Sequence, residues 1–206
     1  MHEWSCSGTK RTSTGFCCSD NVPVVAVTAW QALFDHAQVT AGQAVVIHGA
    51  AGNVGAYAVQ LARRAGVRAI GTAATDVRNL GANTVIDYRT QRFEQEIRDA
   101  DAVIDLVGGD TQARSFQLLR RGGKLISTVS PPDQHLAQSH GVEAALFLVN
   151  VTSRYLAEIA GLVDGGEPRT HVGAGLPLAD AREAHFMLEG VRPRPKGKIV
   201  LTVAAS

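Results

Sequence analysis

Apolar residues along the chain follow two alternating patterns. Short runs rich in β-branched residues alternate with longer segments in which apolar residues return every three or four positions. The predicted strands are 44–47, 67–73, 84–86, 102–107, 124–129, 144–151 and 198–203, and the predicted helices are 29–36, 54–65, 92–98, 111–119, 155–163 and 178–190. This alternation predicts an α/β fold with a doubly wound parallel sheet of about six strands and helices on both faces.

The N-terminal residues show a different pattern. Residues 1–22 are rich in Ser, Thr, Gly and Cys and have no period of two or of 3.6, so we expect a poorly ordered leader ahead of a folded domain at 23–206. Residues 22–27 are predicted to form a short strand or an extended segment, which Pro23 interrupts. Thr28 is predicted to cap the helix that follows.

The strongest local signal lies in residues 44–62, where an apolar strand, the spacing G-x-x-G-x-x-G and a helix follow one another. Gly49 and Gly52 allow the backbone to approach a diphosphate, and Gly55 allows the helix to pack closely on the strand. The N–H groups of residues 52–55 then face the phosphates at the positive end of the helix dipole. A glycine triplet alone also fits a simple Gly-rich turn, but this context predicts a Rossmann-type dinucleotide site.

The end of the second predicted strand bears on the choice between NADP and NAD. An NAD-preferring site has a carboxylate here to accept hydrogen bonds from the ribose. Residues 72–75 contain none, and Arg78 follows closely, which favours the 2′-phosphate of NADP. Two alternatives remain open: Asp76 becomes the ribose acceptor if the turn lies one or two residues later, and Arg78 is an ordinary solvated charge.

Other candidate ligand residues lie where later strands end, because ligands of such sheets bind beyond the carboxyl ends of the strands. Leu106 and Val107 are candidates for the adenine wall, and Tyr88 for a contact with the adenosine phosphate. The alternative for Tyr88 is a place at the edge of the core, and for Phe147 simple packing.

Composition excludes several classes of function. Lys and Arg number 20 against 19 Asp and Glu, a formal charge of +1, so neither nucleic acid nor an anionic membrane is an expected partner. No apolar run has the length of a membrane span and no export signal is present, so we expect a cytoplasmic protein. Cys6, Cys17 and Cys18 crowd into the first 18 residues, which argues against a disulfide framework and against a zinc site that would also use His2.

No motif supplies a catalytic residue. The sequence lacks a G-x-S-x-G elbow and an H-E-x-x-H helix, and its histidines do not fall at ligand spacing. His135, His140, His171 and His185 are interpreted as surface or structural residues. A nicotinamide transfers hydride with little help from the protein, so this does not argue against a redox enzyme.

Several segments together resemble the medium-chain dehydrogenase/reductase superfamily. They are 27–33, 44–55, 87–89, 105–109, 119–129 and 197–201, in the expected order, and the likeness extends over about residues 24–203. Within the superfamily the chain is most similar to the zinc-independent quinone oxidoreductases. The resemblance implies an NADPH-dependent reductase that acts on a quinone or on an alkene activated by a neighbouring carbonyl, and a homodimer formed through the sheet edge near 144–151.

The same resemblance implies roles for individual residues. Residues Gly52, Asn53, Val54 and Gly55 match the pyrophosphate loop, Thr75 and Arg78 the 2′-phosphate pocket with Tyr88 as their partner, and Phe147 and Val149 the backbone that holds the nicotinamide carboxamide. The segment 75–80 is several residues shorter than is usual in the family.

One departure from the family concerns the other wall of the substrate cleft. Members begin with a GroES-like catalytic domain of over a hundred residues, whereas about 25 unrelated residues precede the Thr-Ala-Trp helix here. The family's last strand pairs within that domain, so strand 198–203 is expected to find another partner, to fray or to pair between chains. Three hypotheses follow: an NADPH-dependent oxidoreductase, a nucleotide-binding module without turnover, or a subunit whose substrate wall comes from a separate chain.

Overall fold

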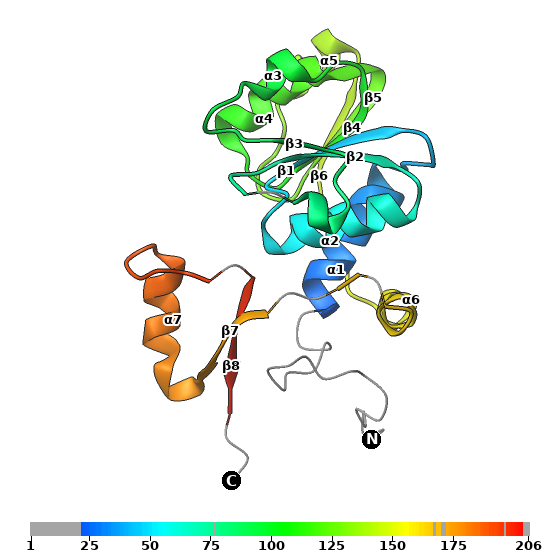
Figure 1. The fold of residues 1–206 in the computed structure, drawn as a ribbon. Helices are drawn as coiled ribbons and strands as arrows, with labels where there is room; N and C mark the ends of the chain where they lie inside the picture. The colour runs from blue at the N-terminus through cyan, green and yellow to red at the C-terminus, as the bar shows by residue number, and fades with distance from the viewer. Residues whose placement is uncertain (1–21, 76, 167, 170–171, 196, 204–206) are drawn as a thin grey trace.

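The computed structural model describes residues 22–75, 77–166, 168–169, 172–195 and 197–203, and its main feature is a six-stranded parallel sheet (Figure 1). The strands are β1 (Ala44–His48), β2 (Arg68–Thr72), β3 (Thr84–Ile86), β4 (Ala100–Asp105), β5 (Leu119–Ser127) and β6 (Glu143–Leu146). Their order is β3-β2-β1-β4-β5-β6, and all five pairings are parallel. The predicted α/β class and Rossmann-type sheet are therefore confirmed.

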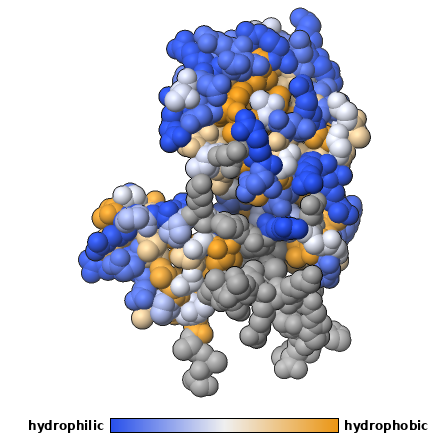
Figure 2. All heavy atoms as spheres, in the orientation of Figure 1, coloured by the Kyte–Doolittle hydropathy of each residue, from blue (hydrophilic) through white to orange (hydrophobic). Residues whose placement is uncertain are grey.

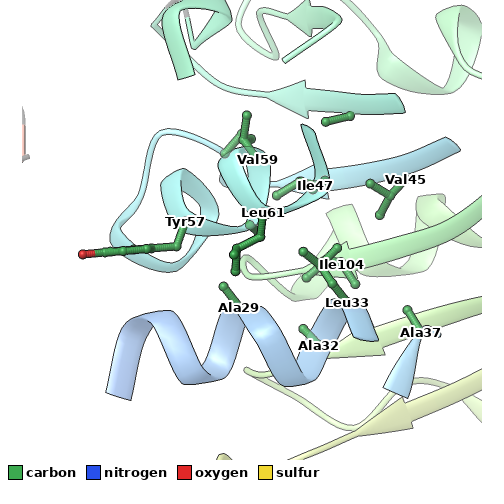
Figure 3. Packing of buried hydrophobic residues seen from close by; sticks show 14 of the residues in the cluster. Ala29, Ala32, Leu33, Ala37, Val45, Ile47, Tyr57, Val59, Leu61 and Ile104 are labelled. Atoms are coloured by element: carbon green, nitrogen blue, oxygen red, sulfur yellow. The ribbon is translucent and has the colours of Figure 1, made fainter. Parts of the chain in front are cut away.

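Helices cover both faces of this sheet. One face carries α1 (Val22–Trp30), the π-helix η2 (Gln31–His36), α2 (Asn53–Arg64) and α6 (Ser153–Asp164). The other carries α3 (Phe93–Glu96), α4 (Gly109–Ser115) with the short turn η4 (Phe116–Leu118), and α5 (Gln134–His140). Side chains of β1 alternate between the two faces: Val45 and Ile47 lie in the same cluster as Leu33 and Leu61 (Figure 3), and Val46 packs on the opposite face. Each face of the sheet thus carries its own cluster of buried apolar side chains.

The C-terminal residues form a separate parallel pair of strands. β7 (Val172–Pro177) leads through η5 (Leu178–Asp180) and α7 (Ala181–Leu188) to β8 (Lys198–Thr202), which pairs with β7. The last strand therefore finds another partner, as one of the three expectations held. Apolar side chains reach the surface of this unit (Figure 2), among them Leu178, Leu188 and Leu201.

The N-terminal prediction was wrong. Residues 22–27 belong to helix α1 and not to a strand, because a proline in the first turn of a helix removes an N–H that has no helical partner there. Thr28 lies inside the helix, and its hydroxyl donates to the carbonyl of Val24 (2.6 Å) instead of capping. Ala26, Val27 and Ala29 are fully buried, so packing outweighs the strand preference of the valines.

Other differences concern boundaries and two elements that were not predicted. The predicted strand 144–151 ends at Leu146, helix 92–98 shrinks to α3, and β5 begins five residues before the predicted start at 124. Helix α5, which Asp133 caps by accepting from the N–H groups of His135 and Leu136, and strand β7 were missed. The proposed leader, apart from Val22, lies outside the described residues. Among those residues, no helix is long and apolar enough to cross a membrane.

Candidate functional site

The glycine turn joins β1 to α2 at the carboxyl edge of the sheet. Gly49 has φ of +72°, a conformation that favours glycine, and its carbonyl accepts from the N–H of Gly52 (2.9 Å). A Cβ at Gly55 would lie 2.3 Å from the Gly49 oxygen and 2.7 Å from the Ala50 Cα. The close approach of helix and strand that was predicted for Gly55 is therefore present, and packing alone requires glycine there.

The first turn of α2 is shaped to receive an anion. Its N-cap, Gly52, supplies no side-chain hydrogen bond, and the first turn contains no acidic residue. The N–H groups of Asn53, Val54 and Gly55 occupy the first helical positions, which have no partner one turn back. Because the Gly52 N–H already bonds to Gly49, three amides and not the expected four point outward from the helix.

The loop after β4 lies directly against this turn. A Cβ on Gly49 would touch Val107 Cγ2 at 3.3 Å and Leu106 Cβ at 3.6 Å, so the structure brings both predicted wall residues to the glycine turn. Val107 is 53% exposed, which leaves its side chain available to a ligand.

Asp105 holds that loop in place and was missed as a site residue. Its fully buried carboxylate accepts hydrogen bonds from the N–H groups of Val107 (3.1 Å) and Gly108 (2.8 Å). It also accepts from Gln112 Nε2 (2.9 Å) and Ser127 Oγ (3.0 Å). An acidic residue at the end of an apolar strand, with Gly-Gly three and four positions later, was the available signal. Asp105 ties the ends of β4 and β5 together.

His48 forms a second buried polar network beneath the edge. Its Nδ1 lies 2.9 Å from Thr72 Oγ1 and its Nε2 lies 2.8 Å from Ser115 Oγ, and Ser115 in turn donates to the carbonyl of Thr111 (2.6 Å). Burial lowers the pKa of His48 from 6.5 to about 4. The network joins the ends of β1 and β2 to α4.

At the end of β2 the structure brings Arg89 to the predicted ribose region. Arg89 Nη2 donates to the carbonyl of Ala74 (2.7 Å) and forms an ion pair with Asp87 (2.6 Å). The hydrogen bond from Arg89 lowers the pKa of Asp87 to about 2. The sequence had marked 87–89 as a strand end without assigning Arg89 a role.

The other residues predicted for this region have mixed positions. Thr75 is half-buried, and Arg78 is exposed at the start of the short turn η3 (Arg78–Leu80). Asp76, the alternative ribose acceptor, lies outside the described residues. Tyr88 is 58% exposed, so its alternative role at the core edge is wrong.

The segment after β6, residues 147–150, is here called the strap. The Phe147 side chain is buried and stacks on His36 with ring centroids 4.3 Å apart. The side chain therefore packs, as the alternative for Phe147 predicted. Its N–H donates to the carbonyl of Ser127 (3.1 Å), which leaves the carbonyl oxygen as the backbone group that Phe147 can offer a ligand. Val149 packs partly into the core, and Leu148 is 85% exposed.

The comparisons with known proteins agree with this geometry. A family model described as zinc-binding dehydrogenase matches residues 80–201, more than half of the chain. The chain belongs to the zinc-binding dehydrogenase family. The resemblance to the medium-chain dehydrogenase/reductase superfamily is thereby confirmed.

Two relatives and one solved structure show how much of this chain is similar to known proteins. A probable mitochondrial zinc-binding oxidoreductase of Arthroderma benhamiae is 33% identical over 203 residues, with 88% of this chain and 61% of that protein covered. A type I polyketide synthase of phenolphthiocerol synthesis from Mycobacterium bovis is 39% identical over 212 residues, with 90% and 10% covered. The quinone oxidoreductase structure from Coxiella burnetii superposes with a TM-score of 0.84 at 31% identity, with 96% and 63% covered. The chain thus spans about three fifths of the length of the Arthroderma benhamiae and Coxiella burnetii proteins.

The family's description mentions zinc, which proteins hold with three or four His, Cys, Asp or Glu side chains. The described residues contain no group of three His, Cys, Asp or Glu side chains placed to hold a metal. His135 and His185 are exposed and His140 is half-buried, while His171 and the three cysteines lie outside the described residues.

Proposed function

We propose that this chain binds NADP(H) and belongs to an oxidoreductase that passes hydride from the nicotinamide to a quinone or an enone. The observation that carries the proposal is the uncapped first turn of α2, with its outward amides, beside an exposed glycine turn at the point where the strand order reverses. The bound cofactor would supply the hydride. The protein residues described above bind and orient it.

In this proposal the two halves of the cofactor lie on the two sides of the reversal between β1 and β4. The diphosphate meets the amides of Asn53, Val54 and Gly55, and the adenosine lies over β1, β2 and β3 against Leu106 and Val107. The nicotinamide lies over β4, β5 and β6, where the strap offers backbone groups.

The preference for NADP over NAD rests on the cations around the end of β2. Arg78 is exposed near this end, and Arg89 reaches the carbonyl of Ala74 from the turn that follows β3. A guanidinium attracts a 2′-phosphate, whereas a free carboxylate would favour the ribose hydroxyl of NAD. Tyr88, exposed beside Arg89, completes the proposed pocket.

The proposal covers two substrate classes, a quinone and an alkene conjugated to a carbonyl. Both substrates accept hydride at a carbon that the neighbouring carbonyl makes electron-poor, so one nicotinamide site suits either. A nucleotide-binding module without turnover remains the alternative from another class of function.

The experiment measures cofactor affinity first and turnover second. NADPH and NADH are titrated by the change in their fluorescence, with wild type, Gly52→Asp and Gly161→Asp compared. Gly161 is the matched control, since it lies on α6 with open space around it. In Gly52→Asp the new carboxylate stands beside the diphosphate, so NADPH affinity is expected to fall by about a hundredfold, and in Gly161→Asp it is expected to stay unchanged.

Each result separates the hypotheses. Tighter binding of NADPH than of NADH, followed by oxidation of NADPH when benzoquinone or a simple enone is added, supports the full proposal. Binding without turnover favours the nucleotide-binding module. Failure of wild type to bind either cofactor would overturn the dinucleotide site itself.

A further inference from the structure

The π-helix η2 contacts the strap at both of its ends. At its start, Gln31 Nε2 donates to the carbonyl of Asn150 (3.0 Å), and Gln31 Oε1 accepts from the N–H of the same residue (3.1 Å). At its end, the ring of His36 stacks on Phe147. The contacts join segments that are more than a hundred residues apart in sequence, and they fall on either side of Leu148 and Val149.

The Gln31 contact is built as a buried double hydrogen bond. Gln31 is only 4% exposed, so water does not compete for its amide, and the loss of either bond would leave a buried polar group unpaired. The backbone around it is also unusual, because the Ala37 N–H bonds to the carbonyl of Ala32 (3.0 Å), five residues earlier. Such widened turns are rare and often occur at functional sites.

The strap lies on one side of the carboxyl edge of the sheet, the edge where ligands of such folds bind. The bond from the Phe147 N–H to Ser127 continues the pairing of β6 with β5 beyond the last strand residue. The strap therefore leaves the sheet on the β4-β5-β6 side of the reversal, opposite to β2 and β3. In a doubly wound sheet this is the half that takes the second nucleotide of a dinucleotide.

We infer that Gln31 is a positioning residue for the nicotinamide end of the cofactor site. The inference rests on the proposed function, and it adds a residue outside the sheet edge that touches no cofactor itself. By holding both backbone groups of Asn150, Gln31 fixes the direction of the strap. The Phe147 carbonyl and the Val149 backbone then stand ordered before the cofactor arrives, so binding does not have to order them.

The test compares two glutamines that make the same kind of contact. Gln60 on α2 also bonds to both backbone groups of one residue, Arg169, with distances of 2.7 and 3.2 Å. Gln31→Met and Gln60→Met each remove two such bonds and keep the side-chain length, and Gln60→Met also removes the bond from Gln60 Nε2 to the carbonyl of Ala56 (3.0 Å). Dissociation constants are measured for NADPH and for adenosine 2′,5′-bisphosphate, which shares the adenosine half but has no nicotinamide.

Gln31→Met is expected to weaken NADPH binding about tenfold and to change the affinity for the bisphosphate by less than about twofold. In Gln60→Met the ratio of the two affinities is expected to match wild type. If Gln31→Met leaves this ratio unchanged while both ligands still bind, the inference is overturned and the proposed function stands. If wild type binds neither ligand, the proposed function fails and the inference fails with it.

A measurement on wild type decides the matter even if Gln31→Met does not fold. Amide hydrogen exchange is followed in the free protein, with saturating NADP and with saturating bisphosphate. Both ligands are expected to slow exchange at residues 53–55, and only NADP at residues 148–150 of the strap. Protection of 53–55 by both ligands, with no added protection of 148–150 by NADP, would overturn the role given to the strap and to Gln31.

Discussion

Acidification from about pH 7.5 to pH 5 is expected to destabilise the fold through the single side chain of His48. The ring is fully buried between Thr72 and Ser115, and burial lowers its pKa from 6.5 to about 4. Below pH 6.5 the unfolded chain binds a proton on this residue and the folded chain does not. The free energy of unfolding therefore falls as the pH drops, and this contribution stops changing below about pH 4.

The size of the effect follows from the two pKa values. A difference of one pKa unit corresponds to about 1.4 kcal/mol, so the fall from 6.5 to about 4 corresponds to ~3 kcal/mol. About 2 kcal/mol of this is lost by pH 5. For a domain with a typical stability of roughly 5–15 kcal/mol, that loss is readily measured.

The assay is urea unfolding, followed by circular dichroism at four pH values between 7.5 and 5. His48→Gln keeps a donor and an acceptor but does not titrate, and it is expected to be less stable than wild type at pH 7.5. The difference in the free energy of unfolding, wild type minus variant, is expected to be about 2 kcal/mol smaller at pH 5 than at pH 7.5. The lowered pKa values of Asp87, Glu94 and Asp101 act in both proteins and cancel in the difference. His135→Gln, at an exposed position, serves as the control. Parallel profiles for wild type and His48→Gln would refute the reasoning.

Two further predictions concern the cofactor preference and the sheet edge. Arg89→Gln removes the guanidinium at the Ala74 carbonyl, so the affinity for NADPH is expected to fall about tenfold and that for NADH to change little, and equal losses for both cofactors would contradict a 2′-phosphate role. Strand β6 is an edge strand with Ala145 and Leu146 exposed, and we propose that it pairs with a second copy of the chain. The N–H of Phe147 bonds to β5, so along the strand the N–H of Ala145 also faces β5 and that of Leu146 faces the open edge. Light scattering at micromolar concentration is expected to give the mass of a dimer, which Leu146→Pro converts to a monomer by removing an edge donor. A monomeric wild type would contradict this.

The parts of the fold that local pattern determines were predictable. The run Ala44–His48 with its glycines and the strong helix formers after it agree at every level, so strand, turn and helix lie where the sequence placed them. The prediction for the first residues of helix α1 failed because its valines favour a strand locally. Only burial against α2 and α6 reverses that preference. Strand β7, with two glycines and a proline, has no local strand signal and exists through its pairing with β8.

The candidate site was predictable in the same uneven way. The strand ends gave Leu106, Val107 and the amides of α2, because topology alone brings carboxyl ends of parallel strands to one edge. The supports behind them were not visible, since a bond such as that from Gln31 to Asn150 joins residues 119 positions apart and leaves no local pattern. Arg89 was within the marked segment, but its contact with Ala74 depends on the pairing of β2 with β3.

The contacts that hold the loops at the carboxyl edge of the sheet differ in strength between its two sides. On the β2-β3 side, the Arg89 to Asp87 ion pair has side chains that are 59% and 33% exposed, and ion pairs of this kind contribute little because water and salt screen them. On the β4-β5-β6 side, the amide of Gln31 is almost completely buried and bonds to both backbone groups of Asn150. A hydride transfer needs its reacting carbon fixed closely, whereas the adenosine only anchors the cofactor. The more rigid support, Gln31, therefore lies on the side where hydride transfer is proposed. The more adaptable ion pair of Arg89 and Asp87 lies where the site is proposed to distinguish the 2′-phosphate of NADP from the ribose hydroxyl of NAD.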